Sequence, residues 1–83
     1  MNLIKIRDAE MRVIALLSLG VVAERCERLP LERCDLWRHA RGSATVGITW
    51  ADESFTLVDF SRAVDADRWL SMSGPLQACL EVH

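Results

Sequence analysis

The stretch ATVGITWADESFTLVDF, residues 44–60, contains two runs of alternating residues separated by a polar insert. In the first run Val46 and Ile48 alternate with threonine and glycine, and the second run, from Phe55 onward, alternates in the same way. A period of two is typical of a half-buried strand, and a short polar insert between two such runs is typical of a hairpin loop. The sequence therefore predicts an antiparallel hairpin whose loop is formed by residues 51–54.

Gly47 is unusual inside this hairpin, because glycine offers no side chain to pack against the rest of a sheet. A glycine in the interior of a strand often marks a bulge or the close approach of another backbone. We expect one of these two features at Gly47.

Helical patterns surround the hairpin. Apolar residues at helical spacing predict helices over residues 30–41 and 62–72, and a short final helix in the tail, residues 76–83. Pro30 suits the first turn of its helix, and Gly42 suits the left-handed position after the last turn. Ser61 is placed to cap the helix that follows it. The hairpin is therefore expected to pack against several helices.

The N-terminal segment RVIALLSLGVVAERC, residues 12–26, is strongly apolar. Its apolar run, residues 13–23, is shorter than the roughly 20 residues that a membrane-spanning helix needs. A secretion signal is the alternative, but Asp8 and Glu10 place acid where such a signal is basic. The segment is therefore predicted to be a helix capped by Asp8, after a short strand at residues 3–7.

This first helix is apolar nearly all round, so it must also be covered nearly all round. A chain of 83 residues has few other elements with which to cover it. Either it is the central helix of the domain, or a second copy or partner covers part of it. The sequence thus predicts a homodimer whose interface includes Val13, Leu16, Leu17, Val21 and Trp50.

The predicted elements follow the order (β)-α-α-β-β-α-α, with the first strand uncertain in type because the helix could extend over it. This order is typical of a small α+β protein, with a two- or three-stranded antiparallel sheet packed on helices. The length favours one domain over residues 1–83.

Charge and cysteine content narrow the class of protein. The net charge of −2 gives no general basic field for nucleic acid or an anionic membrane surface. Three cysteines are an odd and sparse set for a secreted disulfide scaffold, so we expect reduced thiols in a cytoplasmic protein. A zinc site could draw four ligands from Cys26, Cys34, His39, Cys79 and His83, but their spacings match no common structural zinc pattern. We therefore predict no metal and no other cofactor.

The standard catalytic signatures are missing from the sequence, including phosphate loops, nucleophile elbows and paired-histidine zinc motifs. Asp35 and His39 are one helical turn apart on the predicted helix, and we expect an exposed pair of side chains there rather than a catalytic pair. The sequence predicts that the protein is not an enzyme.

Residues 25–41 carry five arginines and one tryptophan. Acidic residues alternate with the arginines, which favours a salt-bridged surface over one that follows phosphates. Tryptophan beside arginine is typical of the centre of a protein interface. We predict a partner-binding surface formed by Arg33, Trp37, Arg38 and Arg41.

These features together predict a non-enzymatic protein-binding module. The small size and the lack of motifs suggest an inhibitor of a larger host protein, encoded by a phage or mobile element, of the anti-CRISPR or toxin-neutralising kind. The alternative hypothesis is a small nucleic-acid-binding transcriptional regulator, since two helices and a hairpin resemble a winged helix in outline.

Overall fold

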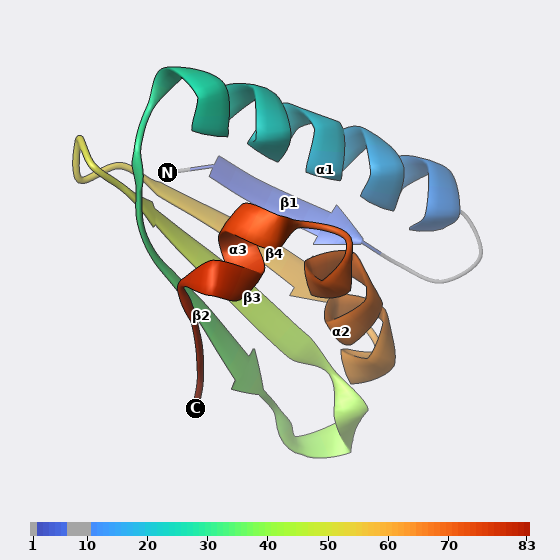
Figure 1. Cartoon of the computed structure of the whole chain (residues 1–83). Helices are drawn as coiled ribbons and strands as arrows, with labels where there is room; N and C mark the ends of the chain where they lie inside the picture. Colours follow the sequence, from blue (N-terminus) through green and yellow to red (C-terminus); the bar gives the residue numbers. More distant parts are fainter. Residues whose placement is uncertain (1, 7–10) are drawn as a thin grey trace.

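The computed structural model describes residues 2–6 and 11–83, with side chains from Gly20 onward. The elements follow in the order β1 (Asn2–Ile6), α1 (Met11–Arg28), β2 (Leu31–Arg38), η2 (Ala40–Gly42), β3 (Ala44–Trp50), β4 (Phe55–Phe60), α2 (Ala63–Ser71), α3 (Gly74–Ala78) and β5 (Leu80–Val82). The strands form one mixed sheet of five, and the described α-helices lie on one side of it (Figure 1). The predicted α+β class is confirmed.

The sheet has the strand order β1-β4-β3-β2-β5. The central strand β3 is antiparallel to both β2 and β4, whereas the edge strands β1 and β5 run parallel to their neighbours β4 and β2. The prediction of two or three antiparallel strands was therefore wrong in detail. Parallel pairs are closed by crossovers rather than hairpins, so a short-range hairpin signal could not reveal how β1 and β5 pair with the sheet.

The hairpin predicted from residues 44–60 is confirmed as β3 and β4. Its loop is closed by the Trp50 N–H, which donates to the Ser54 carbonyl at 3.0 Å. The Asp52 carboxylate accepts from the Ser54 N–H at 2.9 Å, which orders the polar insert. The N-terminal strand is also confirmed, at Asn2–Ile6.

The helix predicted over residues 30–41 is wrong, because Leu31–Arg38 forms strand β2. Cys34 and Leu36 alternate in this segment and pair across the sheet with Ile48 and Val46 of β3. As a strand, the segment pairs with the free side of β3 and buries Cys34 and Leu36 in the core, and this long-range pairing overrides a helical spacing. The predicted positive φ of Gly42 is present, at 80°, but it closes a tight β2–β3 turn instead of a helix.

The C-terminal part of the chain also differs from the prediction. The helix α2 begins at Ala63 with Arg62 at its N-cap, so Ser61 is not the capping residue. The last helix is only Gly74–Ala78, and the residues after it form the edge strand β5. Ser73 caps α3 by accepting from the Leu76 N–H, and Pro75 occupies its first turn.

The hydrophobic core lies between the sheet and the helices. It contains Val22 of α1, Cys34 and Leu36 of β2, Ala44, Val46, Ile48 and Trp50 of β3, Val58 and Phe60 of β4, and Ala66, Trp69, Leu70 and Leu76 of α2 and α3. The core residues of each strand alternate with residues that face the opposite side of the sheet. One face of the sheet is thus a core surface.

The first helix is confirmed at Met11–Arg28, and its predicted cap, Asp8, lies outside the described residues. At its described end Val22 is buried in the core, whereas Val21 is 59% exposed. Within the described part of the chain, no helix combines the length and apolar character that crossing a bilayer requires.

Candidate functional site

The face of the sheet opposite the helices is the candidate functional site. We call it the open face, and it is formed by Arg33, Asp35 and Trp37 of β2, Thr45, Gly47 and Thr49 of β3, Phe55, Leu57 and Asp59 of β4, and Glu81 of β5. These residues alternate with the core residues along each strand, so strand geometry places them together. The open face is therefore continuous across four neighbouring strands.

The indole of Trp37 lies over the backbone of Gly47. A Cβ atom built at position 47 would meet Trp37 Cζ3 at 2.5 Å, closer than real Cβ contacts allow. The sequence predicted a bulge or a backbone approach here, and the structure shows the close approach of a side chain instead. The indole also stacks on the imidazole of His83, with ring centroids 5.5 Å apart and an interplanar angle of 16°. Trp37 is thus held on two sides and half-buried.

Asp35 carries a buried carboxylate on this face, with only 3% of the residue exposed. Arg33 donates to it through two nitrogens, Nε to Oδ2 at 3.0 Å and Nη2 to Oδ1 at 2.9 Å. His83 Nε2 lies 2.7 Å from the same Oδ1 atom. The hydrogen bonds from Arg33 hold the pKa of Asp35 below its ordinary value despite burial, and His83 acts in the same direction. The carboxylate is therefore ionised across the neutral range.

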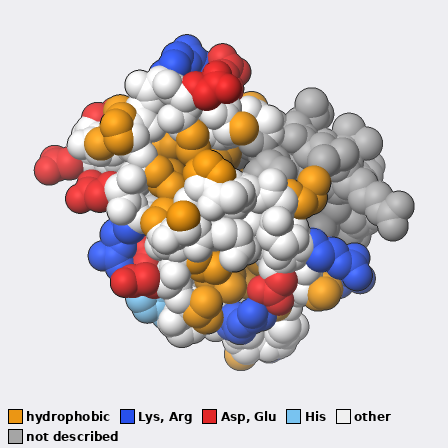
Figure 2. All heavy atoms as spheres, in the orientation of Figure 1, with side chains coloured by type: hydrophobic (Ala, Val, Ile, Leu, Met, Phe, Trp, Pro, Cys, Tyr) orange, Lys and Arg blue, Asp and Glu red, His pale blue; other side chains and the backbone are white. Residues whose placement is uncertain are grey.

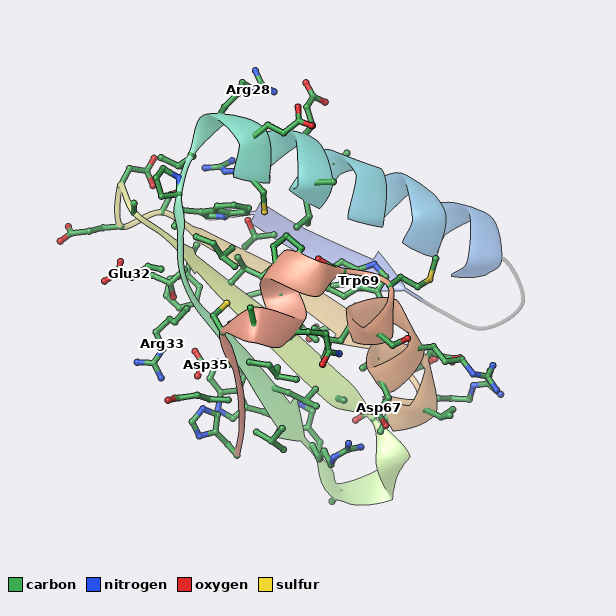
Figure 3. The ribbon with its side chains drawn as sticks, in the orientation of Figure 1. Arg28, Glu32, Arg33, Asp35, Asp67 and Trp69 are labelled. Carbon is green, nitrogen blue, oxygen red and sulfur yellow. The ribbon has the colours of Figure 1, made fainter. Side chains whose placement is uncertain are left out.

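Glu81 extends this cluster to the sheet edge. Its register partner in the parallel β2–β5 pair is Asp35. Arg33 Nη2, which already binds Asp35, also lies 3.3 Å from Glu81 Oε2. Figure 3 shows Arg33 and Asp35 side by side on β2, the strand next to the edge strand β5. One guanidinium thus connects two carboxylates from adjacent strands.

A second polar chain crosses the open face beside Trp37. The Thr45 hydroxyl donates to Asp59 Oδ1 at 2.6 Å, and His39 Nε2 lies 2.8 Å from the same hydroxyl oxygen. Because the hydroxyl proton points to Asp59, Thr45 accepts from His39, and His39 must carry its proton on Nε2. The predicted Asp35–His39 pairing is absent from these contacts, because each of the two side chains has a different partner.

The thiol next to Asp35 in the sequence does not contribute to the open face. Cys34 is the nucleophile nearest in sequence to Asp35, but it faces the core, and burial raises its pKa to about 12. A thiol with that pKa is not a thiolate at neutral pH. The metal-ligating potential is different: among the described residues, Asp35, Glu81 and His83 present ligand atoms that all lie within 4.8 Å of one another.

The predicted partner surface is divided between two sides of the sheet. Arg33 and Trp37 stand on the open face, but Arg38 points to the helix side and pairs with Asp67 of α2 at 2.8 Å. Arg41 lies in the exposed β2–β3 turn, with φ at 73°. The four residues would share one face only on a helix, and the strand separates them by its period of two.

The residues predicted for the dimer interface do not form one exposed surface: Trp50 is in the core, whereas Val21 is exposed. Trp50 is fully buried; its Nε1 donates to Thr56 Oγ1 at 2.9 Å, and the Arg25 guanidinium lies 5.1 Å from its ring centroid. We therefore do not keep Trp50 in the proposed dimer interface. Val21 is exposed, and the side chains of Val13, Leu16 and Leu17 lie outside the described ones.

The three cysteines are free thiols, with Cys26 in α1, Cys34 in β2 and Cys79 between α3 and β5. Cys34 is buried, whereas Cys26 and Cys79 are half-buried, and burial raises the pKa of all three. Neither Cys34 nor Cys79 contributes to the group formed by Asp35, Glu81 and His83. The cysteine–histidine zinc arrangement considered from the sequence therefore has no counterpart in that group.

Sequence reasoning missed the cluster of Asp35, Glu81 and His83. Its signal was present in two short alternations, Arg33-Asp35-Trp37 and Glu81-His83, each of which places polar residues on one face of a strand. The pairing of these two segments joins residues 48 positions apart, which no local pattern reveals.

Comparisons with known proteins add no relative: no family model matches the chain, and neither the curated proteins nor the solved structures give a significant match. Function is therefore inferred from the geometry of the chain itself.

Proposed function

We propose that the chain is a non-enzymatic protein-binding module that engages its partner through the open face. The observation that carries this proposal is the half-exposed Trp37, fixed between Gly47 and His83 on a sheet face opposite the helices. A held indole loses little conformational freedom on binding, which is why tryptophan is enriched at the energetic centre of interfaces. Phe55 and Leu57 extend this apolar surface across β4.

The charges on the open face favour a protein partner over nucleic acid. Arg33 shares the face with three carboxylates, those of Asp35, Asp59 and Glu81, and it already binds two of them. Binding to a phosphate backbone requires uncompensated positive charge. A transcriptional regulator, the alternative hypothesis, would therefore need a different surface.

More specifically, we propose that the chain inhibits a larger host protein in the cytoplasm, as anti-CRISPR or toxin-neutralising proteins do. Its support is the size of the chain, 83 residues, and the buried Cys34 beside Asp35, whose pKa burial raises to about 12. A rigid aromatic surface on a small scaffold suits an inhibitor, because little ordering is needed when it binds.

The partner is tested by affinity capture from the source cell with matched variants. Phe55→Glu places a charge on the open face, and Val64→Glu places one on the exposed side of α2; the two parent residues are 38% and 47% exposed. We expect a stoichiometric protein with the wild type and Val64→Glu, and loss of that protein with Phe55→Glu. Capture of nucleic acid instead, or equal capture by both variants, would reject the proposal.

We also propose that the chain forms a homodimer through α1. Val21, at the end of the predicted apolar stripe of this helix, is 59% exposed although the next residue is buried. On the helix side of the molecule, hydrophobic side chains form a central band with charged groups around it (Figure 2). Such a band is typical of a surface covered by another protein.

Sedimentation of the purified chain tests the dimer. The wild type is expected at about twice the chain mass of 9.4 kDa at micromolar concentration, and Val21→Glu at the mass of one chain. Met72→Glu is the control, because Met72 is 56% exposed and lies at the C-terminal cap of α2, outside the proposed α1 interface. A wild-type monomer at these concentrations would remove this part of the proposal.

A further inference from the structure

Asp35, Glu81 and His83 form a compact set of metal-ligating groups at the β2–β5 edge of the open face. Asp35 and Glu81 are direct register partners, and His83 follows Glu81 by two residues along the same chain direction. Adjacent strands lie about 4.8 Å apart, so the backbone itself brings the two carboxylates together. All the ligand atoms lie within 4.8 Å of one another.

Two of these three side chains, Asp35 and His83, are held in place by their neighbours. Asp35 is buried, so its carboxylate has little freedom, and the His83 ring is fixed by its stack on Trp37. The His83 N–H also donates to the Leu36 carbonyl at 2.9 Å, which holds the backbone of the residue against β2. Preorganised ligands lose less entropy when a metal binds.

We propose that Asp35, Glu81 and His83 bind a divalent transition metal ion of the zinc class, in competition with the guanidinium of Arg33. Two carboxylates and one imidazole suit zinc and its neighbours rather than magnesium or calcium, which prefer oxygen ligands alone. Zinc bonds of about 2.1 Å place ligand atoms about 3.4 Å apart in a tetrahedral site, so the 2.7 Å hydrogen bond between His83 Nε2 and Asp35 Oδ1 opens when the ion enters. The exposed Glu81 side chain has the freedom to close the remaining distance.

Arg33 explains why the cluster is stable without a metal. Its guanidinium binds both carboxylates, so it occupies the electrostatic position that a cation would take. It supplies one positive charge against two negative ones, whereas a divalent ion neutralises both. The Arg33 side chain is 52% exposed and can turn into water when the metal enters. Arg33 therefore acts as an internal competitor that sets the metal affinity.

Titration calorimetry of the full chain with zinc chloride tests the site. We expect one zinc per chain in the wild type. The zinc affinity of His83→Ala is expected to be lower by at least about tenfold, because even the loss of a residue that only hydrogen-bonds to a metal ligand lowers affinity by about that factor. Arg33→Gln is expected to tighten binding by about tenfold, since the metal no longer displaces charge-assisted hydrogen bonds. His39→Ala is the matched control, because His39 belongs to the other polar chain of the same face.

Cobalt substitution separates this site from the cysteines. Cobalt bound by carboxylates and imidazole gives no thiolate charge-transfer band, whereas cobalt bound by Cys26 or Cys79 gives one. Circular dichroism of each variant shows whether it is folded. A thiolate band, equal zinc affinity in His83→Ala and the wild type, or no binding by either the wild type or Arg33→Gln would overturn the proposal.

Discussion

At the scale of single residues, the indole of Trp37 occupies the space that a side chain at position 47 would fill. Gly47→Ala is expected to destabilise the protein by about 1–3 kcal/mol, because the new methyl group meets the edge of a held ring. Urea denaturation measures this change in the free energy of unfolding. Adding Trp37→Leu to Gly47→Ala is expected to restore part of the loss.

Gly20→Ala is the control for that experiment. Nothing lies within 4 Å of a Cβ built at Gly20, which is in the middle of α1. Alanine there is expected to stabilise the helix by about 0.5–1 kcal/mol. Equal effects of alanine at positions 20 and 47 would contradict the contact between Trp37 and Gly47.

Asp35 links the open face to the pH dependence of stability. Its pKa is lowered in the folded protein, mainly by hydrogen bonds from Arg33. An acid with a depressed folded pKa contributes stability above its unfolded pKa of about 4, and that contribution is lost as the pH falls through the folded pKa. We expect metal-free wild type to lose stability below about pH 4 more steeply than Asp35→Asn, in urea denaturation with chelator. Identical pH slopes would show that Asp35 does not have this role.

At the scale of elements, the start of α2 depends on one buried carboxylate. Asp65 lies in the first turn, is 8% exposed and accepts from Arg62 Nε at 2.8 Å. Asp65→Asn is expected to lower the free energy of unfolding by about 1 kcal/mol, because the carboxylate complements both the helix dipole and a cation that is itself mostly exposed.

Asp67→Asn is the comparison for Asp65→Asn on the same helix. Asp67 pairs with Arg38 across an exposed contact, in which both side chains are about half accessible. Such pairs contribute about 0–1 kcal/mol, so this variant is expected to change stability less than Asp65→Asn. Thermal denaturation of the two variants compares them, and the reverse order would contradict the assignment.

The elements also show what the sequence can predict. The β3–β4 hairpin was predictable because its alternation, its polar loop and its pairing all lie within residues 44–60. The strand β2 was not, because Leu31, Cys34 and Trp37 also fit a helical spacing and the choice depends on β3 needing a second neighbour. The candidate site was predicted only in part, for the same reason. Arg33 and Trp37 were identified, but their partners Glu81 and His83 come from β5, at the far end of the chain.

At the scale of the whole molecule, the sheet separates a core that excludes water from a face that presents polar and aromatic groups. Cys34 reports on the first of these, because it is fully buried and its pKa is about 12. We expect Cys26 and Cys79 to react with a thiol reagent in the native protein, and Cys34 to react only at the rate of global unfolding. Mass spectrometry of timed reactions checks this, and fast labelling of Cys34 would contradict the packing of β2 against the helices.

The open face is proposed to bind a protein partner around Trp37. The chain contains three tryptophans, of which Trp50 and Trp69 are buried and Trp37 is half-buried. Fluorine NMR of the chain labelled with 5-fluorotryptophan follows each of them, after assignment by single Trp→Phe variants. On addition of the captured, unlabelled partner, we predict that the Trp37 resonance shifts and that the Trp50 and Trp69 resonances stay in place. A saturated complex in which the Trp37 resonance does not move would contradict the claim.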